Sequence, residues 1–240
     1  MKKILIVLLA IAFSGCVTAT VHKLPPQEIV VKVENGTDAK VEAKKDEPDK
    51  IRKVMNVPYK EPEFSGDAIQ IGDMVFYSIW GHISSIEPLN FKKTLEVMRH
   101  KGIKKMKLFI NSGGGNAFDG MAVADMMEKS IKEGVEINTE ASGLIASAAV
   151  PIFAVGQYRI STHGTMFMVH QGKLFKLFSQ EDKADLKAQH MMMSLEEDRY
   201  NTILEKHTNL SKKEWADRCE KTTWFTAREA KEWGLLDEIR

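Results

Sequence analysis

From residue 64 onward, short apolar runs alternate with segments of helical spacing. The apolar runs predict strands at Met74–Ile79, Lys107–Asn111, Val135–Thr139 and Met166–Val169. Between the second and third runs, apolar residues recur every three or four positions from Ala117 to Ile131, which is typical of one face of an amphipathic helix. Strands that alternate with helices predict an α/β fold built on a largely parallel sheet.

Three further segments predict helices. They are Glu87–His100, Ala146–Phe153 and a long stretch from Gln180 to about Lys206. The long stretch contains three consecutive methionines, Met191 to Met193. Because methionine is apolar and adaptable, we expect them to fill a core or a subunit contact.

The first fifteen residues have the pattern of a secretory signal. Lys2 and Lys3 precede a run of ten apolar residues, Ile4–Phe13, which makes about 15 Å of helix and is too short to cross a bilayer. The segment that ends at Cys16 resembles a bacterial lipoprotein signal, in which the cysteine is lipidated. Residues 1–15 are therefore expected to be a signal peptide, and Cys16 a lipid anchor in the cell envelope. The alternatives are an ordinary signal peptidase site with an incidental cysteine, and a cytoplasmic chain.

Residues 16–63 differ in composition from the rest of the chain. Five of the seven prolines fall here, and the only aromatic residue is Tyr59. Such a segment buries too little apolar surface to offset its ordering entropy. It predicts a disordered tether, in which only the short run Ile29–Val33 could pair as a strand, followed by a folded domain over residues 64–240.

Charge and cysteine content exclude several functions. The 34 basic and 33 acidic residues give a net charge of +1, which offers no basis for binding a nucleic-acid backbone. The two cysteines, Cys16 and Cys219, are too few for a disulfide framework or a cysteine-only zinc site. The sequence also contains no phosphate-binding loop and no metal-binding spacing. We therefore expect no cofactor, metal or nucleic-acid partner.

Three features could carry catalytic chemistry. Gly113–Gly115 exposes backbone N–H groups before a predicted helix, Ser147 lies among small residues, and His170 follows a predicted strand. Taken singly, each has a structural explanation, as a tight turn, a helix cap and a core histidine respectively.

Their order along the chain resembles a known family. Ile110–Gly115 is similar to the Ile-Asn-Ser-Pro-Gly-Gly segment of the Clp protease proteolytic subunit, and Gly143–Ala149 to its nucleophile segment. Arg159–Gly172 resembles the stretch that ends in its catalytic histidine, and Phe225–Asp237 its closing motif. The resemblance implies a Clp protease/crotonase-like α/β fold of repeated β-β-α units with a long protruding helix.

The resemblance also implies site residues for a serine endopeptidase. Ser147 would be the nucleophile and His170 the general base, and the backbone amides of Gly115 and Ala148 would form the oxyanion hole.

The acidic member of the triad does not follow directly from the alignment. The family's aspartate aligns with Arg218, so we expect Asp217, one residue away, to orient the histidine, with Glu220 as the alternative.

The expected partners follow from the same resemblance. They are a peptide or unfolded-protein substrate, further copies of the chain in a ring, and a membrane through a lipidated Cys16. For an exported protein we expect no Clp-type ATPase.

Three other functions stay open from the sequence. A catalytically silent scaffold would keep the fold without the triad. A membrane-associated protease like the signal peptide peptidases would use a Ser–Lys pair, against which His170 argues. An acyl-coenzyme-A enzyme of the crotonase fold is the third.

Overall fold

The computed structural model describes residues 29–33, 38–43, 56–58, 63–64, 66–174 and 180–240. The chain divides into two compact units between Glu61 and Pro62. The expected signal peptide, residues 1–15, and the expected lipid anchor, Cys16, lie outside the described residues.

The first unit contains a three-stranded antiparallel sheet. Its strands, in the order β1-β2-β3, are β1 (Ile29–Val33), β2 (Asp38–Ala43) and β3 (Asn56–Pro58). The apolar run Ile29–Val33 thus pairs as a strand. The other two strands lie in a segment whose composition predicted no regular structure.

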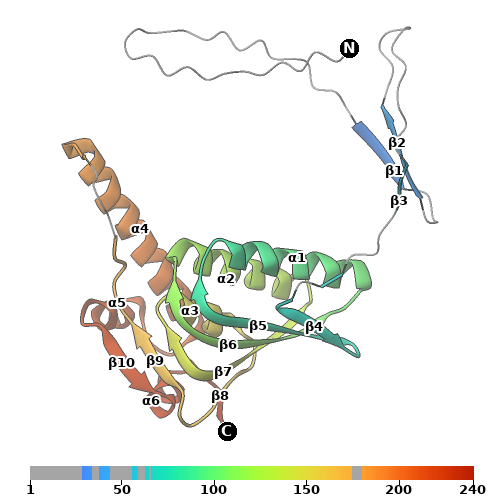
Figure 1. Cartoon of the computed structure of the whole chain (residues 1–240). Helices are drawn as coiled ribbons and strands as arrows, with labels where there is room; N and C mark the ends of the chain where they lie inside the picture. Colours follow the sequence, from blue (N-terminus) through green and yellow to red (C-terminus); the bar gives the residue numbers. More distant parts are fainter. Residues whose placement is uncertain (1–28, 34–37, 44–55, 59–62, 65, 175–179) are drawn as a thin grey trace, which may run out of the picture. The chain divides into compact units, whose positions relative to one another are not determined.

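The second unit is built on one mixed sheet (Figure 1). Its main path runs β10-β9-β7-β6-β5-β4. The strands are β4 (Ala68–Ile71), β5 (Met74–Ile83), β6 (Lys105–Gly115), β7 (Glu136–Ala146), β9 (Met166–Val169) and β10 (Thr223–Thr226). Strands β5, β6, β7 and β9 are parallel, and β4 and β10 pair antiparallel at the two edges. Two short strands, β8 (Arg159–Ser161) and β11 (Glu238–Ile239), extend the sheet beside β7.

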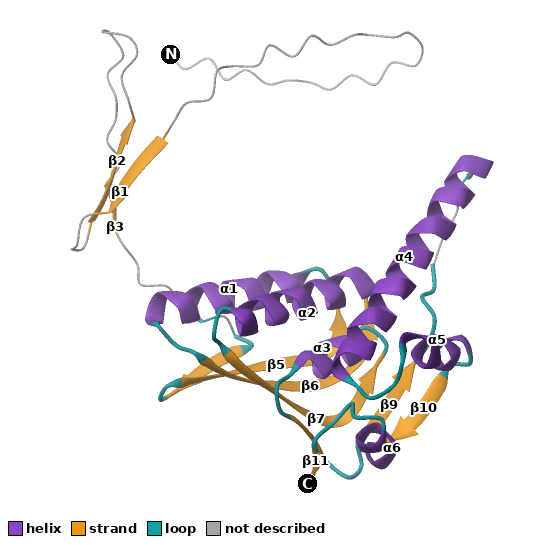
Figure 2. Cartoon of the chain, turned by 180° about the vertical axis from the view of Figure 1, so that it is seen from behind, coloured by secondary structure: helices purple, strands orange, loops and turns teal. Residues whose placement is uncertain are grey.

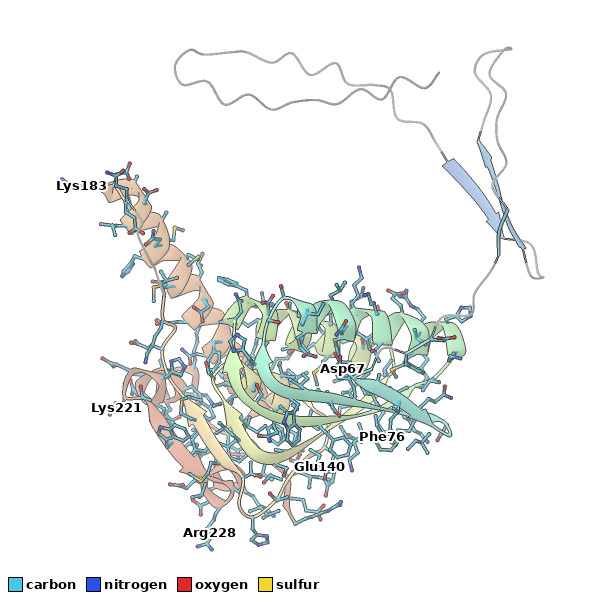
Figure 3. The ribbon with its side chains drawn as sticks, viewed as in Figure 1. Asp67, Phe76, Glu140, Lys183, Lys221 and Arg228 are labelled. Carbon is cyan, nitrogen blue, oxygen red and sulfur yellow. The ribbon has the colours of Figure 1, made fainter. Side chains whose placement is uncertain are left out.

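The described residues of this unit also form six helices. They are α1 (Ile86–Lys101), α2 (Ala117–Lys132), α3 (Ala149–Val155), α4 (Lys183–His207), α5 (Lys212–Glu220) and α6 (Ala227–Glu232). Helices α1 and α2 lie side by side over one face of the sheet (Figure 2). Helix α4 extends away from the body, with Lys183 at its far end (Figure 3). The predicted α/β class is confirmed.

The core lies between the sheet and these helices. Alternate residues of β5, such as Val75, Tyr77 and Ile79, are buried against the helices, as the period of two in a strand requires. The ring of Tyr77 meets Phe91 of α1 edge-on, with 5.3 Å between the ring centroids. Helix α2 begins where Asn116 accepts a hydrogen bond from the Asp119 backbone N–H.

Two local predictions were wrong. The glycine segment expected to be a turn forms the end of β6, where Gly114 pairs with His82 of β5. The helix expected from Ala146 begins at Ala149, because β7 continues to Ala146 and pairs there with Met168 of β9. Both differences arise from pairing between distant segments, which local sequence pattern does not reveal.

The sheet face turned away from α1 and α2 carries exposed apolar side chains. We call this the outer sheet face and define it by the exposed Ile69, Ile71 and Trp80 and the half-buried Phe76 and Phe109. Phe76 and Glu140, labelled in Figure 3, lie on this side of the sheet. The side chain of Trp80 is the most exposed, at 74%. A face of this kind indicates a surface for another protein chain.

Within the part of the chain that the structure describes, no helix is both long enough and apolar enough to cross a membrane.

Candidate active site

A cavity of about 560 Å³ opens where parallel strands of the sheet end. Its wall combines the carboxyl ends of β5 and β6, the start of α3, the segment after β9, and one face each of α4 and α5. In open α/β sheets, ligands bind at this edge of the strands. Ser147, His170, Gly115 and Ala148, all predicted as site residues, line this one cavity.

Ser147 adopts a strained backbone conformation between β7 and α3. Its φ is +54°, which residues with a side chain rarely adopt. The Ser147 N–H donates to the carbonyl of Met168 in β9 with an N–O distance of 2.8 Å, and this bond holds the turn in place. Strained residues of this kind concentrate at active sites, where a sharp strand-to-helix turn exposes a nucleophile.

The glycines of β6 let its backbone pass directly beside this turn. A Cβ atom on Gly114 would lie 2.6 Å from the Ala146 carbonyl oxygen and 2.9 Å from the Ala148 nitrogen. A Cβ atom on Gly115 would lie 2.0 Å from the Ile83 carbonyl oxygen. Only glycine fits at either position, and the backbone of β6 therefore forms part of the wall beside Ser147.

His170 reaches the same cavity from the end of β9. Its Nδ1 atom lies 2.5 Å from the carbonyl oxygen of Gln171. The Gln171 N–H in turn donates to the carbonyl of Cys219 in α5, at 3.1 Å. No hydrogen bond joins the side chains of Ser147 and His170 in the described part of the chain. Catalytic hydrogen bonds are often long or poorly aligned before substrate binds, so the lack of a hydrogen bond between these two side chains is compatible with a nucleophile–base pair.

The structure does not bring the expected acid, Asp217, to this cavity. Helix α5 faces the cavity with Ala216 and Cys219, and Asp217 lies on the exposed side of the helix. Its carboxylate pairs with Lys213 of the same helix, with an N–O distance of 3.6 Å. The alternative, Glu220, is also exposed.

Arg218, which takes the place of the family's aspartate in the alignment, does not line the cavity. Its guanidinium lies 4.5 Å from the ring centroid of Trp233 and donates to the carbonyl of Glu214. Helix α5 therefore contributes no acid to the described wall.

Helix α4 supplies lining residues that the sequence analysis did not assign to the site. They are Met192, Met193, Glu196, Glu197, Tyr200 and Asn201. The hydroxyl of the buried Tyr200 donates to the carbonyl of Ser147, at 3.1 Å, and burial raises the pKa of Tyr200 well above its ordinary value. The spacing of three and four residues that marks one face of α4 is visible in the sequence, but nothing in it distinguishes a cavity wall from a subunit contact.

Cys219 is not a candidate nucleophile. Burial, followed by the charge of Glu197, raises the pKa of its thiol to about 12, so the reactive thiolate does not form near neutral pH. Among the described residues, no group of three or more His, Cys, Asp or Glu side chains could hold a metal ion.

Comparison with known proteins decides the family. A family model described as Clp protease matches residues 90–240, more than half of the chain. The chain belongs to the Clp protease family. The segment that the Clp protease model matches begins in α1 and includes every residue discussed in the cavity wall except those at the end of β5.

Proteins similar to this Clp protease family member include Clp protease proteolytic subunits. It is 30% identical over 137 residues to the ATP-dependent Clp protease proteolytic subunit of Bacteroides fragilis, a match that covers 57% of this chain and 64% of that relative. It is 30% identical over 138 residues to the ATP-dependent Clp protease proteolytic subunit 1 of Thermobifida fusca, covering 57% and 60%. The chain therefore spans less than two thirds of the length of these relatives.

A solved structure supports the fold. A mutant of ClpP1 from Listeria monocytogenes superposes with a TM-score of 0.60 at 21% identity, over 69% of this chain and 90% of that one. The predicted Clp protease/crotonase-like fold is confirmed by this likeness.

Proposed function

We propose that this protein is a serine endopeptidase in which Ser147 is the nucleophile and His170 the general base. The observation that carries the proposal is the cavity itself. It joins a serine in a strained turn after β7 to a histidine at the end of β9, beside the glycine backbone of β6. Membership of the Clp protease family supports the same chemistry.

The reaction proceeds by acyl transfer. The Ser147 Oγ attacks the peptide carbonyl carbon while its proton passes to the Nε2 of His170. The carbonyl electron pair moves onto oxygen, and the backbone N–H groups of Gly115 and Ala148 stabilise that oxyanion. When the tetrahedral intermediate collapses, the proton on Nε2 is transferred to the leaving amine nitrogen. Water then releases the acyl group by the same steps, with His170 again as the base.

The direct test is labelling with a fluorophosphonate probe, which reacts with activated serines. We expect the wild-type chain to be labelled and Ser147→Ala to remain unlabelled, with hydrolysis of a fluorogenic peptide lost in the same variant. Labelling that persists in Ser147→Ala would assign the reactive serine elsewhere and overturn the proposal.

A catalytically silent scaffold is the second candidate function. It is favoured by one observation, the position of Asp217 on the exposed side of α5, outside the cavity. The labelling experiment separates the two candidates, because a scaffold would leave wild type and Ser147→Ala equally unlabelled.

The proposed enzyme works as a homo-oligomeric ring. The outer sheet face supports this, as does the protruding part of α4, where the apolar Leu186, Met191 and Leu195 are exposed. Apolar surface of this extent is usually covered by a partner, and copies of the same chain are the commonest one.

We also propose that the protein acts outside the cytoplasm, anchored through a lipidated Cys16. The positive start, the short apolar run and the cysteine in the sequence support this. Such an enzyme takes short or unfolded peptides without a nucleotide-driven partner. Fractionation of wild type beside Cys16→Ser tests the lipid anchor. Casein digestion with and without ATP tests whether hydrolysis is independent of a nucleotide-driven partner. Cytoplasmic recovery of an uncleaved wild-type chain would contradict the location.

A further inference from the structure

The orientation of the His170 ring depends on what its Nδ1 atom contacts. A base that accepts a proton at Nε2 must carry its own hydrogen at Nδ1, and an acceptor at that nitrogen fixes this tautomer. The carbonyl oxygen of Gln171, 2.5 Å away, is that acceptor. A carbonyl holds the tautomer but has no charge with which to stabilise the imidazolium that forms during attack. A carboxylate is needed for the second task, and helix α5 presents none to the cavity.

Helix α4, on another side of the cavity, does present one. The carboxylate of Glu196 packs against Gly172, two residues after His170. A Cβ atom on Gly172 would lie 2.5 Å from Oε2 of Glu196 and 3.2 Å from Oε1 and Cδ. The absence of a side chain at Gly172 is what allows the carboxylate to lie directly against the backbone that follows the histidine.

The Glu196 carboxylate has no counter-ion among the described residues, although it is partly buried. Burial, followed by the charge of Glu197, raises its pKa. The charge of Glu196 also contributes to the raised pKa of Tyr200, whose hydroxyl bonds Ser147. An unpaired, partly desolvated carboxylate is costly to fold, and such groups concentrate at functional sites.

We infer that Glu196 is the acidic positioning residue of the catalytic unit. The Gln171 carbonyl fixes the tautomer of His170, and the Glu196 carboxylate, across Gly172, stabilises the positive charge of the imidazolium. In a Ser-His-Asp triad one aspartate performs both tasks, whereas here two separate groups perform them. This inference rests on the proposed function. During attack the proton of Ser147 moves to Nε2, the hydrogen on Nδ1 stays in place, and no proton passes to Glu196.

The test compares Glu196→Gln with Asp198→Asn, which removes a carboxylate from the same helix outside the cavity, where Asp198 pairs with Lys212. With a fluorogenic peptide, we expect Glu196→Gln to lower kcat about 10- to 100-fold while KM stays within about twofold. The loss of kcat is limited because the Gln171 carbonyl still fixes the tautomer of His170. The rate of fluorophosphonate labelling should fall by the same factor. Asp198→Asn should stay within about twofold of wild type, and Glu196→Asp should recover part of the loss.

Gly172→Ala provides an independent test if Glu196→Gln fails to fold. A methyl group at residue 172 displaces the carboxylate, so the rate should fall although Glu196 is still present. The double variant should be no slower than the slower single variant, because both remove one interaction.

Each outcome bears on one claim. Equal labelling rates in wild type and Glu196→Gln would overturn the role of Glu196 alone. A raised KM with unchanged kcat would also overturn it, by showing that the carboxylate binds substrate. An unlabelled wild-type chain would overturn the proposed function itself.

Discussion

Gly114 lies so close to Ser147 that a Cβ atom on the glycine would be 2.7 Å from the Cβ of the serine. Gly114 lies in β6, Ser147 directly follows the neighbouring parallel strand β7, and both residues line the cavity. The same glycine has a φ of +89°, which disfavours any other residue.

We expect Gly114→Ala to lower kcat about 100-fold or more, because the methyl group must push Ser147 and the Ala148 amide out of line. Gly113→Ala is the matched control. Its Cβ would meet only Leu144, at 3.8 Å, so its activity should stay near that of wild type. Peptide hydrolysis by the two variants, with light scattering to confirm the same assembly, makes the comparison. Equal activity of both variants would contradict the assigned geometry.

Ser147→Ala and His170→Ala should each abolish peptide hydrolysis while the assembly persists. Members of a catalytic unit act together, so the double variant should be scarcely worse than either single variant. Steady-state kinetics of the three variants at equal concentration provides the measurement. A double variant that is slower than both singles by the product of their effects would show that the two residues act independently.

Tyr200→Phe should reduce both stability and activity. The buried hydroxyl donates to the Ser147 carbonyl, and its loss leaves that acceptor unsatisfied at a cost of about 1 kcal/mol in the free energy of unfolding. Tyr158→Phe is the control, because it removes an exposed hydroxyl that bonds Glu238 away from the cavity. Urea denaturation and peptide hydrolysis should both show a larger loss, of stability and of activity respectively, for Tyr200→Phe than for Tyr158→Phe. The finding that Tyr158→Phe is the more damaging change would count against the role of Tyr200.

The ion pair between Arg159 and Asp237 should give stability that depends on pH. Burial acts to raise the pKa of Asp237, but hydrogen bonds from the side chain and backbone of Arg159 outweigh it and hold the pKa below its ordinary value. A lowered carboxyl pKa stabilises the folded chain above the unfolded-state pKa of about 4, and this contribution is lost as the pH falls through the lowered value.

Asp237→Asn should therefore cost about 2 kcal/mol in the free energy of unfolding at pH 7 and much less near pH 2. Denaturant titrations of wild type and variant at several pH values provide the measurement. A difference that stays constant from pH 7 to pH 2 would show that the charge of Asp237 is not what stabilises the fold.

Trp80→Glu should dissociate the proposed ring, because it places a charge on the outer sheet face at its most exposed apolar residue. Leu89→Glu, on the helix that covers the opposite face of the sheet, is the control and should leave the assembly intact. Light scattering at micromolar concentration measures both. A wild-type monomer at these concentrations would contradict the proposal of a ring.

Local pattern predicted the elements that are periodic on their own. The helix from Ala117 was recognisable because its apolar spacing continues for four turns, and Met166–Val169 because its apolar run is complete. The short edge strands β4 and β10 were missed, because their pairing partners, rather than their own composition, make them strands.

The candidate site divides in the same way. Ser147 and His170 could be assigned to one site because their segments resemble motifs of the Clp protease family, and both residues line the cavity. The acid could not, because a difference of one residue on α5 decides whether a side chain faces the cavity, as Ala216 does, or the solvent, as Asp217 does. The position of Glu196 in the cavity could not be predicted from the sequence around it, because it depends on the absence of a side chain at Gly172, on a distant segment.

Helix α4 has 25 residues, a length of about 37 Å, and its buried residues all lie in its last third, from Tyr200 to Leu204. The cavity wall at Met192 and Met193 therefore belongs to a stretch of helix whose side chains are exposed or only partly buried. An isolated helical turn without tertiary contacts is marginal in water. A subunit without neighbours would fray at this wall while its core stayed folded. Specific activity should therefore fall on dilution, because each subunit of the proposed enzyme would be active only within the oligomer.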